Sequence, residues 1–243
     1  MTYCVGLKLD RGLVFAADTR TNAGVDNVAT FKKLHTWEKA DDRVLVLMSA
    51  GNLAVTQAVV SLLSEHIVQA GDGKPTLMTV DTMFQAARLV GSAVREVHQI
   101  DGEALAASAD SFMVTLILGG QIKGEAPRLF QIYAAGNFIE VSEDTPFLQI
   151  GEHKYGKPIL DRVTRRDMRL GEAAKMVLLS FDSTLRSNLS VGMPIDLFLY
   201  NTDSFSSERQ RRIEQDDPYF QKLSGAWSEK LRQAFADIEE FDV

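Results

Sequence analysis

A run of five apolar residues, Val44–Met48, carries no polar residue at alternate positions. Strands with one solvated face alternate apolar and polar residues, so this run indicates a strand that is covered on both faces. The turn-forming residues Ala40–Arg43 separate it from the preceding segment Lys33–Glu38. The two segments predict a β-hairpin inside a layered fold, with other elements packed above and below it.

A second hairpin is predicted at the start of the chain. Apolar residues alternate along Thr2–Leu9 with the period of a strand, and Leu13–Ala17 is a second, mostly apolar strand. The turn Asp10–Gly12 joins them. The next segment, Asp18–Ala29, is polar, and we expect a loop there.

The remaining segments alternate between helical and extended patterns. Long helices with apolar stripes are expected at about Asn52–Ala70 and Thr79–Ile100, with Thr79 as the N-cap of the second. The later elements are strands at Ser111–Gly119, Arg128–Tyr133, Asn137–Val141 and Phe147–Ile150, helices at Tyr155–Val163 and Leu170–Ser187, and a strand at Ile195–Asn201. Locally paired strands followed by paired helices predict an α+β fold, a four-layer αββα sandwich.

The chain of 243 residues contains no obvious linker or repeat. We therefore expect a single domain over residues 1–243, with a C-terminal helical extension at about 217–241. That extension opens with an Asp-Pro pair, which is typical of a helix start.

Charge and cysteine content restrict the partners and the compartment. The net charge of −7 argues against a nucleic-acid partner, and the basic run Arg209–Arg212 lies among acidic residues, as on a solvated helix face. A single cysteine, Cys4, cannot form an intramolecular disulfide, which fits a reducing compartment. The sequence shows neither a secretory signal nor a membrane-length apolar segment. We expect a cytoplasmic protein without nucleic-acid or membrane partners.

Thr2 is the first candidate catalytic residue. Removal of Met1 would free the α-amino group of Thr2, which has an ordinary pKa of about 7.7–8.0 and can act as a base near neutral pH. Hydroxyl and base would then lie on one residue, as in an activated N-terminal threonine. A threonine after the initiator methionine is common, however, so Thr2 alone indicates nothing.

Two charged residues are expected to lie near Thr2. Asp18 ends the second strand, and the hairpin brings that end beside the start of the first strand. Lys33 could pair with Asp18, and its ammonium would favour the deprotonated hydroxyl and the neutral amine of Thr2. The alternatives are a turn-forming aspartate and a surface lysine.

Gly51 follows the buried strand and precedes a helix, where free N–H groups can stabilise an oxyanion, although an ordinary strand-to-helix turn explains it equally well. The histidines lack metal-ligand spacing, and the chain has no phosphate-binding glycine loop. We expect neither a metal nor a cofactor.

These motifs together resemble a known family. The segments Thr2–Leu7, Ala16–Arg20, Lys32–Leu34 and Ser49–Gly51 resemble the N-terminal third of proteasome β subunits, and in particular the bacterial ancestral β-subunit family, Anbu. The resemblance continues more loosely through Gly151 and the segment from Ser190 onward.

The resemblance implies a threonine peptidase. Thr2 would be the nucleophile, Asp18 and Lys33 its charged pair, and the Gly51 amide the oxyanion donor. Arg20, Ser187 and Ser190 are possible supporting residues.

The resemblance also implies a peptide or unfolded protein as substrate and self-assembly into a ring or an open spiral. It leaves any ATPase partner unspecified. Two positions depart from the family pattern, because Glu152 stands where a serine is usual and Ser187 where an aspartate is usual. Two other hypotheses therefore stay open, namely an amidohydrolase acting on small amides and a catalytically weak subunit that serves assembly.

Overall fold

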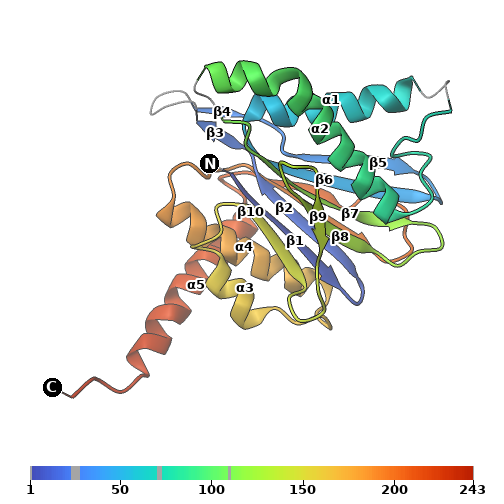
Figure 1. Cartoon of the computed structure of the whole chain (residues 1–243). Helices are drawn as coiled ribbons and strands as arrows, with labels where there is room; N and C mark the ends of the chain where they lie inside the picture. Colours follow the sequence, from blue (N-terminus) through green and yellow to red (C-terminus); the bar gives the residue numbers. More distant parts are fainter. Residues whose placement is uncertain (1, 23–27, 70–72, 109–110, 243) are drawn as a thin grey trace.

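A computed structural model describes residues 2–22, 28–69, 73–108 and 111–242 of the chain (Figure 1). Its strands form two main sheets that pack face to face, and pairs of helices cover the outer faces. The four-layer αββα sandwich predicted from the sequence is confirmed.

The first sheet has the strand order β10-β1-β2-β11-β12, with antiparallel neighbours. Its strands are β1 (Tyr3–Leu9), β2 (Gly12–Asp18), β10 (Phe147–Gly151), β11 (Ile195–Asn201) and β12 (Gln210–Ile213). The predicted N-terminal hairpin is its centre. The helices α3 (Lys157–Val163) and α4 (Leu170–Ser187) pack on its outer side.

The second sheet has the order β5-β6-β7-β8-β9, and its neighbouring strands are also antiparallel. Its strands are β5 (Leu34–Lys39), β6 (Arg43–Gly51), β7 (Val114–Ile122), β8 (Arg128–Ile132) and β9 (Phe138–Glu140). The long helices α1 (Leu53–Val68) and α2 (Met83–Ala107) lie across its outer face.

The run Val44–Met48 behaves as its lack of alternation predicts. Leu45 and Leu47 pack toward α1 and α2, whereas Val44, Val46 and Met48 belong to the cluster between the two sheets. All five side chains are buried. In β1 the alternation separates Tyr3, which packs with the α3–α4 layer, from Cys4, which lies between the sheets.

Four local predictions are corrected by the structure. The segment expected as a loop contains β3 (Arg20–Asn22) and β4 (Val28–Thr30), which form a small two-stranded sheet. Their pattern is polar because β4 has no buried residue, which removes the apolar alternation that identifies a strand. Residues 23–27 lie outside the described residues.

Helix α2 is capped by Thr82, whose hydroxyl accepts a hydrogen bond from Gln85 N at 3.1 Å, and not by Thr79. The Thr79 hydroxyl instead accepts from Thr76 N at 2.8 Å and closes a preceding turn. Strand β7 begins at Val114, because Met113 N bonds back to Ser111 O in a turn.

The basic run Arg209–Arg212 lies mostly in strand β12 and not on a helix. This strand is at the edge of its sheet, where charged side chains remain solvated and oppose pairing with another chain.

The last helix, α5 (Pro218–Ala236), begins at the Asp-Pro pair, and Asp217 caps it by accepting from Phe220 N at 3.0 Å. It leaves the sandwich and projects away from α4 (Figure 1).

Candidate functional site

The first hairpin brings Asp18 to the start of β1. Because Cys4 pairs with Ala17, the following residue Asp18 lies beside Tyr3. Tyr3 N donates a hydrogen bond to Asp18 Oδ1 at 2.9 Å. The proximity of Asp18 to the first residues of the chain therefore follows from the hairpin register, as predicted.

Asp18 and Lys33 form a buried ion pair. Lys33 Nζ lies 2.8 Å from Asp18 Oδ1, and the two side chains are 3% and 0% exposed. The ammonium also donates to the carbonyl of Arg20 at 2.6 Å. Lys33 is thus held by two acceptors in a fixed position, and the surface-lysine alternative is excluded.

The environment of Asp18 contains opposing effects on its pKa. Burial raises the pKa of the carboxyl group, whereas the Lys33 ammonium and the N–H groups of Tyr3 and Gly192 oppose that rise. Gly192 N donates to Asp18 Oδ2 at 3.3 Å, from the loop that follows α4. Since removing one partner of a buried pair leaves an uncompensated charge, each residue depends on the other for its position.

Thr2, Lys33 and Gly51 line the same small cavity. Its volume is about 20 Å³, and its other lining residues are Thr21, Ser49, Ala50, Leu53 and Thr56. The four principal residues predicted from the sequence, namely Thr2, Asp18, Lys33 and Gly51, are thus brought together by contacts or by a shared cavity.

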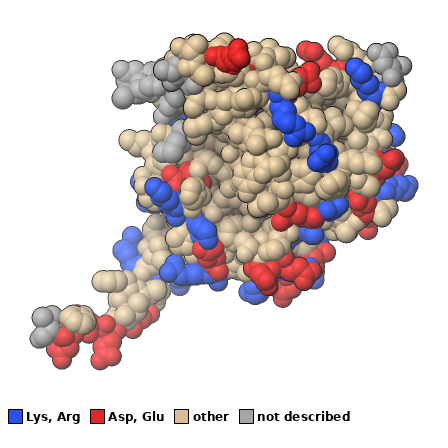
Figure 2. Space-filling view, viewed as in Figure 1, with Lys and Arg blue, Asp and Glu red and all other residues tan. Residues whose placement is uncertain are grey.

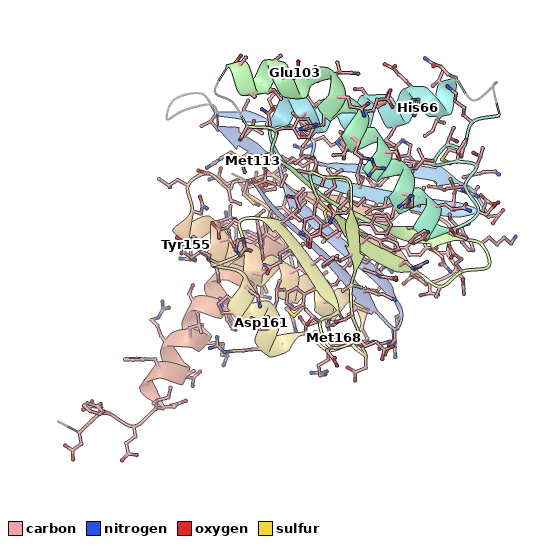
Figure 3. The ribbon with its side chains drawn as sticks, viewed as in Figure 1. His66, Glu103, Met113, Tyr155, Asp161 and Met168 are labelled. Carbon is pink, nitrogen blue, oxygen red and sulfur yellow. The ribbon has the colours of Figure 1, made fainter. Side chains whose placement is uncertain are left out.

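Gly51 is required by its backbone conformation. Its φ is +126°, and a Cβ atom there would lie 2.1 Å from the carbonyl oxygen of Met113. The carbonyl of Met113 also accepts from Asn52 N at 2.7 Å, which fixes the start of α1 against β7. Met113 is labelled in Figure 3, near the end of the molecule where the chain begins in Figure 1.

The backbone after β10 holds Thr2 from the other side. Glu152 N donates to the Thr2 carbonyl at 2.6 Å. Gly151 has a φ of +80°, and a Cβ atom there would lie 2.0 Å from the same carbonyl oxygen. A glycine at 151 therefore allows the close approach of the two backbones.

The possible supporting residues occupy different environments. Arg20 donates to the carbonyl of Leu189 at 3.1 Å, and its guanidinium fills the space that a Cβ on Gly192 would need. Ser190 N bonds to Asn188 Oδ1 at 2.9 Å, whereas Ser187 ends α4 with an exposed side chain.

Sequence reasoning assigned no role to the pair Glu152 and Asn188. Both residues are buried, and Asn188 Nδ2 donates to Glu152 Oε2 at 2.7 Å. Glu152 was noted only as a departure from the family pattern. No sequence signal marks Asn188, because the contact joins positions 36 residues apart. Met1, whose removal the sequence predicts, lies outside the described residues.

Within the parts of the chain that the structure describes, no group of three or more His, Cys, Asp or Glu residues could hold a metal ion. In the same residues, no helix has the length and apolar character needed to cross a bilayer.

The sandwich, with a threonine immediately before β1, has the fold class of the N-terminal-nucleophile hydrolases. The family model "Proteasome subunit" matches residues 2–198, and the chain belongs to this family.

Solved structures of Anbu proteins are similar over the whole chain. A mutant Anbu from Hyphomicrobium sp. strain MC1 is 65% identical with a TM-score of 0.93, and all of both chains is covered. Anbu (ancestral beta-subunit) from Yersinia bercovieri is 51% identical with a TM-score of 0.92, covering 99% of this chain and 100% of the other. The helical assembly of the Anbu complex from Pseudomonas aeruginosa is 45% identical with a TM-score of 0.93, at 99% and 98% coverage.

Proposed function

We propose that the chain is a proteasome-type threonine peptidase that uses Thr2 as its nucleophile after removal of Met1. The observation that carries this proposal is the buried Asp18–Lys33 pair, because Lys33 also lines the cavity beside Thr2. A buried, fixed cation next to a hydroxyl lowers the free energy of its deprotonated form.

The reaction follows from these positions. The free α-amino group of Thr2 accepts the proton of its own hydroxyl, and Oγ1 attacks the carbonyl carbon of the scissile amide. The Gly51 N–H stabilises the oxyanion that forms. The proton passes to the leaving amine as the C–N bond breaks, which leaves an ester on Thr2. Water then hydrolyses that ester, releases a carboxylic acid and restores the hydroxyl.

The substrate in this proposal is a peptide or an unfolded protein. A second candidate function is an amidohydrolase that acts on small amides, because an activated N-terminal threonine serves acyl transfer generally. Both functions use the same nucleophile, so the substrate alone distinguishes them.

Self-association is the second part of the proposal. The Pseudomonas aeruginosa Anbu forms a helical assembly, and α5 of this chain presents exposed apolar side chains beyond the sandwich. Repeated head-to-tail contacts of identical subunits close into a ring or continue as a spiral. We propose such a homo-oligomer of single-domain subunits. We place it in the cytoplasm because its single cysteine, Cys4, cannot form an intramolecular disulfide, which fits a reducing compartment.

An activity comparison tests the assignment. The assembled protein is incubated with unfolded casein, with fluorogenic peptides that vary in the residue before the scissile bond, and with small amides such as glutamine. Peptide cleavage that Thr2→Ala abolishes supports the peptidase. Cleavage of small amides alone would establish the amidohydrolase instead. The absence of turnover on all substrates would leave assembly as the function and overturn both enzymatic proposals.

A further inference from the structure

Glu152 is a buried carboxylate with a complete set of donors around it. The residue is 6% exposed. Its Oε1 accepts hydrogen bonds from His153 N at 2.9 Å and Lys154 N at 2.7 Å, while its Oε2 accepts from Asn188 Nδ2 at 2.7 Å. Burial alone raises the pKa of this carboxyl group, but the three donors outweigh burial and lower the pKa. Glu152 is therefore ionised at neutral pH.

The Glu152 backbone is fixed to the residue proposed as the nucleophile. Its N–H holds the Thr2 carbonyl at 2.6 Å, directly after the β1–β10 register pairs Tyr3 with Gly151. The absence of a side chain at Gly151 permits this approach, since a Cβ there would lie 3.2 Å from the Thr2 Cβ as well. The ionised carboxylate consequently belongs to the residue whose N–H binds the Thr2 carbonyl.

The carboxylate belongs to the loop after β10 and not to α4. At the end of α4, Ser187 is exposed. The next residue, Asn188, turns inward and binds Glu152. The negative charge thus enters the site from the loop after β10, and α4 contributes only the amide that orients it.

We propose that Glu152 is a positioning residue that sets the basicity of the Thr2 α-amino group, with Asn188 holding its carboxylate in place. This inference rests on the proposed N-terminal-nucleophile function. The Lys33 ammonium favours the neutral amine, whereas the Glu152 carboxylate favours the protonated amine. Together they keep the pKa of the amine near the pH at which it must exchange a proton.

Other titratable groups around this pair come from each neighbouring element. They are Tyr3 on β1, Asp18 at the end of β2, Lys33 before β5, and His153 and Lys154 after β10. Burial raises the pKa of Tyr3 to about 12, so Tyr3 is neutral over the relevant range. Asp18 forms an ion pair with Lys33, whereas the Glu152 carboxylate does not pair with that lysine.

The test is the pH dependence of Thr2 acylation in the full-length protein. The second-order rate of labelling by a peptide epoxyketone, which reacts with both the hydroxyl and the amine, reports the pKa of the free amine. Glu152→Gln removes the charge and keeps the size of the side chain. We expect the midpoint of its rate profile to fall by about one pH unit.

Matched variants separate this effect from a change in folding. Glu152→Asp retains the charge and is expected to retain the wild-type midpoint even if its rate is lower. Glu65→Gln makes the same substitution at an exposed position of α1 and is expected to behave as wild type. Equal midpoints in wild type and Glu152→Gln would overturn the inference while leaving the threonine mechanism intact. A wild type that is never labelled would instead overturn the proposed function, and this inference with it.

Discussion

The surroundings of Thr2 and the end of helix α5 differ in how far their side chains are buried and paired within one chain. Around Thr2, charged groups are buried and paired, as in the contact between Asp18 and Lys33. In α5, Phe220 is the one buried residue, although the whole helix is described. Nearer the C-terminus, the side chain of Phe235 is 80% exposed and that of Phe241 is 88% exposed.

The C-terminal tail, residues 231–242, also combines apolar and acidic side chains. Its exposed apolar residues include Leu231 and Ile238, and acidic residues gather at the projecting end (Figure 2). Soluble monomers rarely leave such apolar surface uncovered. We propose from this comparison that the nucleophile site forms within one subunit, whereas the tail packs against a partner subunit.

The largest expected effect comes from breaking the buried pair. Lys33→Ala removes the cation beside Thr2 and leaves the Asp18 carboxylate buried without its partner. Labelling of Thr2 by the epoxyketone should fall by at least about a thousand-fold, the range expected when an activating group is lost. Asp18→Asn should have nearly the same effect, because Lys33 loses its anchor.

Circular dichroism and thermal unfolding serve as controls for these two variants. Lys39 is exposed on β5, the strand that follows Lys33. The variant Lys39→Ala is expected to be labelled at Thr2 as efficiently as wild type. Equal labelling of wild type, Lys33→Ala and Asp18→Asn would show that the pair has no role in activating Thr2.

Removal of the tail should change assembly and leave the subunit folded. A chain that ends at Lys230 keeps Phe220 and the hydrogen bond from Arg186 Nη2 to Ser224 Oγ at 2.8 Å. We expect the full-length protein to be a large oligomer and the shortened chain to run near or below the 26.9 kDa monomer mass. Light scattering coupled to size exclusion measures both masses at micromolar concentration.

A surface variant elsewhere provides the control for assembly. Ile100→Ser removes an exposed apolar side chain on α2 and should leave the oligomer unchanged. A full-length protein that is monomeric, or a shortened chain that assembles as before, would contradict the role of the tail.

The same substitution in the two regions should have different effects on stability. Phe181 is fully buried, and its ring centroid lies 4.6 Å from that of Tyr3. Phe181→Ala should lower the free energy of unfolding by about 3–5 kcal/mol because it leaves a cavity. Phe241→Ala should change it by less than about 0.5 kcal/mol.

The effect of Phe181→Ala is measured by urea unfolding of dilute protein that ends at Lys230. Because this shortened chain is expected to be monomeric, its unfolding is not coupled to assembly. The Phe241 variant is measured in the full-length chain against its own wild type, both at a dilution at which light scattering shows monomers. Similar losses for both substitutions would mean that the tail packs within its own subunit.

Acid is expected to have a smaller effect on stability, and this effect arises from a residue within the sandwich. Burial, reinforced by the nearby Lys32, lowers the pKa of His35 on β5 to about 4. In the unfolded chain the ordinary value of about 6.5 applies, so the unfolded state binds the proton first. Stability is therefore retained above about pH 6.5 and declines as the pH falls toward 4, with a loss of about 2 kcal/mol by pH 5.

Unfolding by urea at pH 7.5 and pH 5 measures this loss, and His35→Gln should remove it. His153→Gln, at an exposed position, should show the wild-type dependence. An identical pH dependence in His35→Gln and wild type would show that other groups cause the decline.

Much of the fold follows from local pattern. The lack of alternation in Val44–Met48 and the alternation in β1 predict which faces are covered, because burial acts on each side chain separately. Strand β12 and the short strands β3 and β4 were missed for the opposite reason. The side chains of β12 are mostly exposed and β4 has no buried residue, so these strands carry no apolar period, and among the described residues β3 pairs only with β4.

The candidate site is predictable to the extent that it depends on one hairpin. The β1–β2 register alone places Asp18 beside Tyr3, whereas Lys33 and Gly51 each had an ordinary alternative in the sequence, and the resemblance favoured their roles in the site. The contact between Glu152 and Asn188 could not be predicted, because it joins a loop to the end of α4 across the tertiary fold. Ser187 was proposed as a supporting residue, but the side chain that turns inward is that of the next residue, Asn188.

The most direct test of the central claim is the intact mass of the purified protein before and after reaction with the epoxyketone. The proposed mechanism predicts a mass that lacks Met1, a single adduct after reaction, and localisation of that adduct to Thr2 by peptide sequencing. Thr2→Ala should remain unlabelled under the same conditions. A protein that retains Met1 throughout and still cleaves peptides would contradict the claim that Thr2 is the nucleophile.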